Sequence, residues 1–199
     1  MAETGEKTKE QIIKVAAQLI HLRGYNNTSV DDILRESGIG KGSFYYHFKN
    51  KEELGFAVLE WHVNRFGTEI LDSTCGGTGD PLKRITCFLD AVAARQREEN
   101  CQGGCAMGNL ALEMSDVHDG FRQRLVGVFD AWRKRIEEIL VDAQKSERIR
   151  QSLDPGSLAQ FIVATVEGAI LLGKVKKDSH VLVECFKHVK DYLHQSSIK

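Results

Sequence analysis

The side chains best suited to chemistry in this chain lie between positions 41 and 51, where hydroxyl donors are flanked by lysines. They are Lys41, Ser43, Tyr45, Tyr46, His47, Lys49 and Lys51. No acidic residue occurs from position 37 to position 51. Hydroxyl groups beside lysines suit phosphate oxygens, and a short serine can approach a base edge in the major groove. The segment therefore predicts a surface that binds a polyanion, most specifically double-stranded DNA.

Two short helices around a glycine turn are expected to position these donors. Thr28 is placed to cap the first helix, with Asp31 and Asp32 in its opening turn, where carboxylates meet the positive end of the helix dipole. The pair Ser37-Gly38 then ends this helix, because glycine adopts the left-handed conformation of a tight turn without a Cβ penalty.

The second helix is expected to begin at about Lys41 and to bury one face. Phe44 and Phe48 stand four residues apart, so both would pack inward and leave the intervening donors in solvent. Together the two helices predict a helix-turn-helix. A helical hairpin with a solvated basic loop is the alternative interpretation of the same residues.

Residues 40–54 read Gly-Lys-Gly-Ser-Phe-Tyr-Tyr-His-Phe-Lys-Asn-Lys-Glu-Glu-Leu and closely resemble the DNA-binding signature of the TetR family of bacterial transcriptional repressors. The resemblance is strong from Ile12 to Leu59, and beyond that it extends only to the helical layout. It implies that Gly42 and Ser43 face bases and that Phe44 and Phe48 are core residues. It also implies phosphate contacts for Thr28, Lys41, Tyr45, Tyr46, His47 and Lys51.

Composition places the chain among ordinary globular proteins. The formal net charge is −1, so attraction for a polyanion must come from the local basic run. No apolar run approaches the roughly 20 residues that cross a membrane, and the N-terminal residues lack an apolar signal core. Five cysteines without a disulfide-framework spacing suit a reducing compartment. We therefore expect a cytoplasmic protein without a membrane partner.

Apolar residues recur at helical spacing along the whole chain, and no convincing alternating run is present. The helices expected outside the helix-turn-helix cover about residues 7–23, 51–71, 81–97, 106–115, 117–145, 155–175 and 179–194. Asp80 and Asp154 each precede a proline, which is the order of an N-cap and a first helical position. The expected fold is all-α. Residues 1–52 would form a three-helix DNA-binding domain, and residues 53–199 a larger helical ligand-binding and dimerisation bundle.

The last two expected helices are apolar over a wide arc, more than one neighbouring helix can cover. A second copy of the chain would bury the excess in a symmetric four-helix interface. The TetR resemblance implies the same homodimer. The alternative is that both helices complete the core of one protomer. The expected interface residues are Phe161, Thr165, Gly168, Ala169, Leu172, Val181, Leu182, Cys185, Phe186 and Val189.

Cys105 is the candidate reactive thiol. It falls where the helix from about residue 106 begins, and the unpaired N–H groups and dipole of a helix N-terminus stabilise a thiolate. A similarly placed cysteine occurs in TetR-like repressors that sense electrophiles and oxidants, which implies a thiol sensor. Cys101, four residues earlier, is the candidate resolving thiol. A small buried or merely exposed cysteine is the alternative interpretation.

Other spacings do not support a metal site, a cofactor or a catalytic centre. Cys101 and Cys105 lack the Cys-x-x-Cys spacing and a second ligand pair nearby. The glycines from Gly38 to Gly42 lack the register and the preceding strand of a phosphate-binding loop. No triad or carboxylate pair can be identified from spacing. We expect no metal and no cofactor.

The residues and the resemblance together predict a homodimeric repressor of the TetR type that binds a near-palindromic operator and is released by a small-molecule effector. Two alternatives stay open. One is a DNA-binding activator or architectural protein on the same scaffold, and the other is an all-α enzyme that uses the cavity of the larger bundle.

Overall fold

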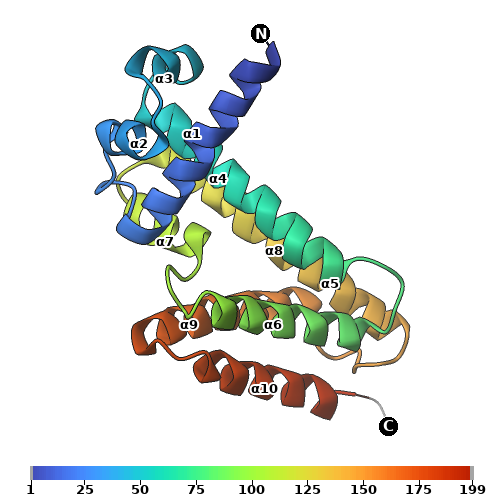
Figure 1. The fold of residues 1–199 in the computed structure, drawn as a ribbon. Coiled ribbons are helices and arrows are strands. Elements are labelled where there is room, and N and C mark those ends of the chain that lie inside the picture. The colour runs from blue at the N-terminus through green and yellow to red at the C-terminus, as the bar shows by residue number, and fades with distance from the viewer. Residues whose placement is uncertain (1, 198–199) are drawn as a thin grey trace. The chain divides into compact units, whose positions relative to one another are not determined.

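A computed structural model describes residues 2–197 of the chain, and their side chains from residue 5 onward. Every regular element among the described residues is helical, as the sequence predicts (Figure 1). The elements are α1 (Ala2–Arg23), α2 (Val30–Ser37), α3 (Lys41–His47), α4 (Lys51–Phe66), η1 (Gly67–Asp72), α5 (Ser73–Cys75), α6 (Pro81–Glu98), α7 (Ala106–Met114), α8 (Asp119–Lys145), α9 (Pro155–Lys176) and α10 (His180–Gln195).

The chain folds as two compact units. The first contains the residues up to 65 together with residues 106–123, so it consists of helices α1, α2, α3 and α4 with α7 and the first turn of α8. The second contains residues 66–105 and the residues from 124 onward. The domain boundary expected after residue 52 stays a prediction.

The first unit has a helix-turn-helix between residues 29 and 48, with one change from the expected capping. Ser29, not Thr28, is the N-cap of α2: its hydroxyl accepts the Asp32 backbone N–H at 3.1 Å. Asp32 in return accepts the Ser29 backbone N–H at 3.0 Å, which completes a capping box. The Thr28 hydroxyl points the other way and donates to the Gly24 carbonyl at 2.8 Å.

The turn between α2 and α3 forms as predicted. Gly38 has φ of 68°, the left-handed conformation, and its N–H donates to the Leu34 carbonyl at 3.0 Å. Phe44 and Phe48 are both buried, with ring centroids 5.9 Å apart. They pack α3 onto the core of the first unit, which also contains Ile12 and Ile33.

The helix that follows α3 is longer and less regular than expected. Asn50 caps it, because its Oδ1 accepts the Glu53 N–H at 2.8 Å. The helical path then continues from α4 through η1 and α5 to Cys75, with π-helical hydrogen bonding over residues 67–72. The sequence predicted one α-helix to about residue 71. A π segment inserts an extra residue into a turn, and apolar spacing alone does not reveal it.

The second unit packs α10 against both α6 and α9, whose ribbons lie side by side in Figure 1. The predicted caps are confirmed: Asp80 Oδ1 accepts the Leu82 N–H at 3.0 Å, and Asp154 Oδ2 accepts the Ser157 N–H at 3.2 Å. Two charged pairs add tertiary links, Lys190 with Asp90 at 2.5 Å and Arg148 with Asp80 at 2.6 Å.

Helix α9 is more apolar than expected. The helix has 22 residues, and an 18-residue window within it has a mean hydropathy of 1.6, so by length and composition it could cross a membrane, contrary to the expectation that no run approaches that limit. In this fold 44% of that window is buried, and the buried side chains of the helix include Leu158, Ile162 and Ala169.

Candidate nucleic-acid interface

Helix α3 carries the predicted donors on its outer face. Tyr46 is 82% exposed and Tyr45 48% exposed, whereas Phe44 on the same helix has no exposed surface. Lys41 and Ser43 are exposed in the first turn of the helix. The structure therefore brings these hydroxyls and a lysine together on one seven-residue helix, as the spacing predicted.

Local packing orients the aromatic donors of α3. The Tyr45 ring lies edge-on to the Phe44 ring at 5.2 Å between centroids, and the Tyr46 ring lies edge-on to His47 at 4.9 Å. These contacts restrict the rings while the phenol oxygens face outward. Gly42 is exposed and has open space where a Cβ would stand, so the backbone of α3 can approach a ligand closely.

Lys51 is partly exposed and contacts Tyr25, and the phosphate contact that the resemblance implies for it stays a prediction. Its Nζ donates to the Tyr25 carbonyl at 2.5 Å and stands 4.2 Å from the centroid of the Tyr25 ring. Burial lowers the pKa of the Lys51 ammonium below its usual range, and the nearby Glu113 carboxylate opposes that shift. The ammonium is thus engaged by the protein itself.

Thr28 is also inside the protein. It has no exposed surface, and its hydroxyl is the donor to Gly24 described above. The donors that the structure gathers on an accessible surface are therefore Lys41, Ser43, Tyr45, Tyr46 and the partly exposed His47. Thr28 and Lys51 make hydrogen bonds to the Gly24 and Tyr25 carbonyls at the connection between α1 and α2.

Sequence reasoning missed Glu113 in α7. Its Oε2 accepts the Tyr25 N–H at 2.8 Å and its Oε1 accepts the Asn26 N–H at 2.6 Å. The carboxylate therefore caps the turn that leads into the helix-turn-helix. The partners are 87 and 88 positions apart in sequence, so no local pattern could connect them.

Comparison with known proteins agrees with this geometry. Residues 12–58 match the family model for bacterial regulatory proteins of the tetR family, and residues 81–189 match the model for the tetracyclin repressor-like C-terminal domain. The chain belongs to the TetR family. Members of this family bind operator DNA and act as dimers that respond to ligands.

Three relatives illustrate the extent of the similarity. An uncharacterized HTH-type transcriptional regulator in the lacX 3'region of Lactococcus lactis subsp. lactis is 35% identical over 183 residues, covering 92% of this chain and 91% of that protein. The HTH-type transcriptional repressor DhaR of Mycobacterium sp. (strain GP1) is 30% identical over 175 residues, covering 87% and 86%. A TetR transcriptional regulator from Chloroflexus aurantiacus J-10-FL has a TM-score of 0.91 at 29% identity, covering 98% of both chains. This TetR-family chain is a DNA-binding transcriptional regulator.

The expected dimerisation surface of this TetR-family chain divides into two sets. Phe161 is 53% exposed and Leu172 50% exposed, and a Cβ on Gly168 would meet open space. Thr165, Val181 and Cys185 are partly exposed. Four other expected residues are buried in the protomer: Ala169, Leu182, Phe186 and Val189. Their part in a dimer interface stays a prediction.

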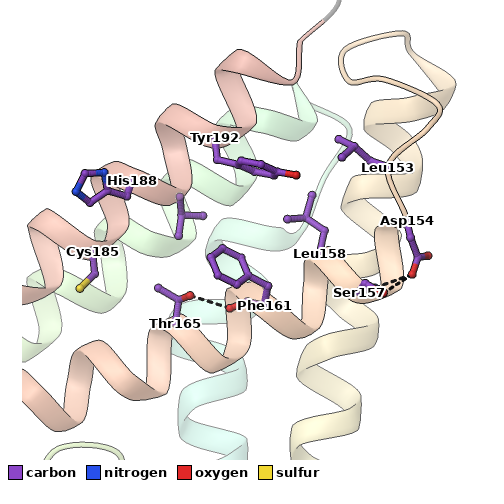
Figure 2. Close-up of a pocket in the computed structure, with 10 residues that line it drawn as sticks. Leu153, Asp154, Ser157, Leu158, Phe161, Thr165, Cys185, His188 and Tyr192 are labelled. Atoms are coloured by element: carbon purple, nitrogen blue, oxygen red, sulfur yellow. Dashed lines mark hydrogen bonds between the residues drawn. The ribbon is translucent and has the colours of Figure 1, made fainter.

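A groove of about 700 Å³ runs between α9 and α10 on this side of the TetR-family bundle (Figure 2). Figure 2 shows the rings of Phe161 and Tyr192 projecting into it from the two helices. Thr165 also lines the groove, and its hydroxyl donates to the Phe161 carbonyl at 2.8 Å. The exposed surface here is mainly apolar.

The two cysteines before α7 differ in environment. Cys101 is buried, and burial raises the pKa of its thiol. Cys105 is partly exposed and hydrogen-bonds the side chain of Glu167 in α9. Burial raises the pKa of the Glu167 carboxyl, and the contact with Cys105 partly offsets that shift. Among the described side chains, no three His, Cys, Asp or Glu residues come close enough together to hold a metal ion.

Proposed function

We propose that this TetR-family regulator is a repressor that binds a near-palindromic operator as a homodimer in the cytoplasm. The observation that carries the proposal is the outer face of α3, which presents Ser43, Tyr45 and Tyr46 with no acidic residue between positions 37 and 51. Two copies of α3 in a dimer would enter successive major grooves about 34 to 36 Å apart.

Within this proposal, the α3 side chains have different tasks. The exposed phenols and Lys41 contact phosphates, which sets affinity for all duplexes. Ser43 and the open backbone at Gly42 approach base edges, which sets sequence preference. Phe44 and Phe48 hold the helix in place from inside.

The homodimer is supported by the exposed apolar side chains of α9. Phe161 and Leu172 are each about half exposed, and a protomer gains by covering a contiguous apolar surface of this kind. A second copy brings the same surface, so a two-fold axis pairs α9 and α10 with their equivalents.

Release from DNA is proposed to follow effector binding in the second unit. An effector that binds one conformer more tightly shifts the population toward it, and only a conformer with correctly spaced α3 helices binds the operator. A reactive Cys105 is the second route to release. It is favoured by the position of this thiol immediately before α7.

The decisive experiment is selection of bound duplexes from random DNA, followed by footprinting on the selected sequence. We expect a two-half-site motif with protection on one face of the duplex, and repression of a reporter that carries it. A reporter that is activated instead would replace the repressor by an activator. Protection without sequence preference would indicate an architectural protein. If the protein retains no duplex from the random pool, DNA binding is contradicted altogether.

The thiol route has its own test. Operator binding is measured before and after N-ethylmaleimide in the wild type and in Cys105→Ser, with mass spectrometry of the adduct. Loss of binding only in the wild type, with the adduct on Cys105, supports the thiol sensor. Equal loss in both proteins, or no adduct at Cys105, leaves a reversible small-molecule effector.

A further inference from the structure

The peptide group of Tyr25 is held from both sides in the first unit. On one side its N–H donates to Glu113 Oε2 from α7 at 2.8 Å. On the other side its carbonyl accepts the Lys51 ammonium from α4 at 2.5 Å. Glu113 also accepts the next amide, that of Asn26, at 2.6 Å. Two charged side chains from different helices thus converge on one turn of backbone.

That turn connects α1 to α2, and its conformation is closely specified. Gly24 has φ of +91°, and a Cβ at Gly24 would stand 3.1 Å from Glu113 Oε2. The Thr28 hydroxyl donates to the Gly24 carbonyl at 2.8 Å, and the Thr28 N–H donates to the Tyr25 carbonyl at 3.3 Å. Ser29 begins the capping box of α2 directly after this turn. Displacement of the turn therefore displaces α2 and, through the Gly38 turn, α3.

The side chain of Tyr25 adds a third constraint. Its ring is 7% exposed and lies edge-on to Phe121 in the first turn of α8, with centroids 5.1 Å apart. The Lys51 ammonium stands over the same ring at 4.2 Å. A hydrogen bond with an ionised partner is about twice as strong as a neutral one, so the carboxylate is difficult to replace.

We propose that Glu113 is a positioning residue for DNA binding, and that Glu113 and Lys51 together clamp the Tyr25 peptide so that α2 and α3 are held in their DNA-reading arrangement. In this role Lys51 acts through the turn and not through a phosphate. The clamp also makes α7 the helix whose movement frees the α1–α2 turn. The inference rests on the proposed function, because DNA binding is the activity that the clamp supports.

Three variants test the clamp. Glu113→Gln keeps the side-chain length but leaves one acceptor for two amides and turns an NH₂ group toward a donor. Lys51→Met keeps the apolar stem and removes the ammonium. Glu60→Gln is the control, because it removes one negative charge from an exposed position of α4 in the same unit. Dissociation constants are measured on the duplex selected with the wild type, over a series of salt concentrations.

We expect Glu113→Gln and Lys51→Met each to weaken binding about tenfold, equivalent to about 1.4 kcal/mol, at a temperature where both proteins are folded. The slope of log affinity against log salt stays at the wild-type value in both, because no phosphate contact is lost. The double variant loses less than the product of the two single effects, since both act on one peptide. Glu60→Gln binds like the wild type.

Amide hydrogen exchange tests the clamp independently of DNA binding, because it measures the protection of the Tyr25 and Asn26 amides directly. The Tyr25 and Asn26 amides exchange faster in Glu113→Gln than in the wild type or Glu60→Gln, while the amides of α9 are unchanged. If Glu113→Gln does not fold, Glu113→Asp replaces it; this carboxylate is one methylene shorter, keeps the charge, and reaches only one of the two amides.

The possible results distinguish a failure of the proposed clamp from a failure of the proposed DNA-binding function. Wild-type affinity in Glu113→Gln together with unchanged exchange at Tyr25 and Asn26 overturns the inference. A salt slope lowered by about 1 in Lys51→Met also overturns it, because Lys51 would then contact a phosphate. A wild-type protein that binds no duplex overturns the proposed function and leaves the exchange result as the test of the clamp.

Discussion

Gly55 in α4 faces the ring of Tyr25 so closely that a Cβ at position 55 would lie 2.6 Å from Tyr25 Cε2. The same Cβ would lie 2.7 Å from Phe121 Cζ. Both neighbours are buried aromatic rings that pack against each other, so neither can move aside alone. Glycine at this position therefore lets α4 approach the turn that Glu113 and Lys51 hold.

We predict that Gly55→Ala destabilises the protein by about 1 to 3 kcal/mol, the cost of overpacking a close contact. The better helix propensity of alanine, about 1 kcal/mol, offsets only part of that cost. Urea unfolding measures the difference. Gly127→Ala in α8 is the matched control, because a Cβ there meets open space, and it should stabilise the protein. A gain in stability for both variants would show that α4 has room to move.

The second prediction concerns the outer face of α3. Tyr46→Phe should weaken binding to every duplex by about 1.5 kcal/mol, because the exposed phenol donates to a charged phosphate. Lys41→Ala should weaken all sequences together and lower the salt slope by about 0.9. Ser43→Ala should change the preferred base sequence instead. Fluorescence anisotropy on matched and mismatched duplexes distinguishes the three, and an unchanged affinity for Tyr46→Phe would remove the phosphate assignment.

The third prediction separates interface residues from core residues on α9 and α10. Phe161→Asp and Leu172→Asp should produce folded monomers, since both side chains are about half exposed in the protomer. Phe186→Asp should instead unfold the protomer, because it buries an unpaired charge at a position that is 2% exposed. Sedimentation velocity at micromolar concentration and thermal melting report the two effects. A monomeric wild type would contradict the dimer.

The fourth prediction is a pH dependence at the start of α2. Hydrogen bonds from the Ser29 hydroxyl and backbone, and then from Arg35, lower the pKa of Asp32 to about 2. An unfolded aspartate titrates near pH ~3.9. The folded value is the lower of the two, so the carboxylate stabilises the fold above about pH 4 and loses that contribution as the pH falls toward 2.

Asp32→Asn tests that dependence by urea unfolding at pH 7, 5 and 3. The variant should be less stable than the wild type at pH 7 and 5, and the difference should narrow at pH 3. Asp31→Asn, on the exposed side of the same turn, is the control. A difference between wild type and Asp32→Asn that is independent of pH would show that the capping geometry, not the charge, matters.

Local sequence signals were sufficient to place most of the helices and to identify the outer face of α3. Asp80 and Asp154 cap the helices that their positions predict, and Gly38 ends α2 in the left-handed conformation. The four-residue spacing of Phe44 and Phe48 also decided which α3 side chains face outward. These features depend on bonds within one helical turn, so they can be recognised in a short stretch of residues.

Tertiary packing decided what the lysine and hydroxyl residues around α3 contact. Lys51 and Thr28 carry the right groups for phosphate contacts, yet the ammonium of Lys51 meets a carbonyl 26 residues away and Thr28 turns to Gly24. Packing likewise left Phe161 exposed while burying Phe186, although both belong to apolar stripes. The Glu113 contact joins α7 to residues 87 and 88 positions earlier. Helical periodicity specifies the face on which a side chain lies, but its partner depends on which distant backbone groups folding brings within hydrogen-bonding distance.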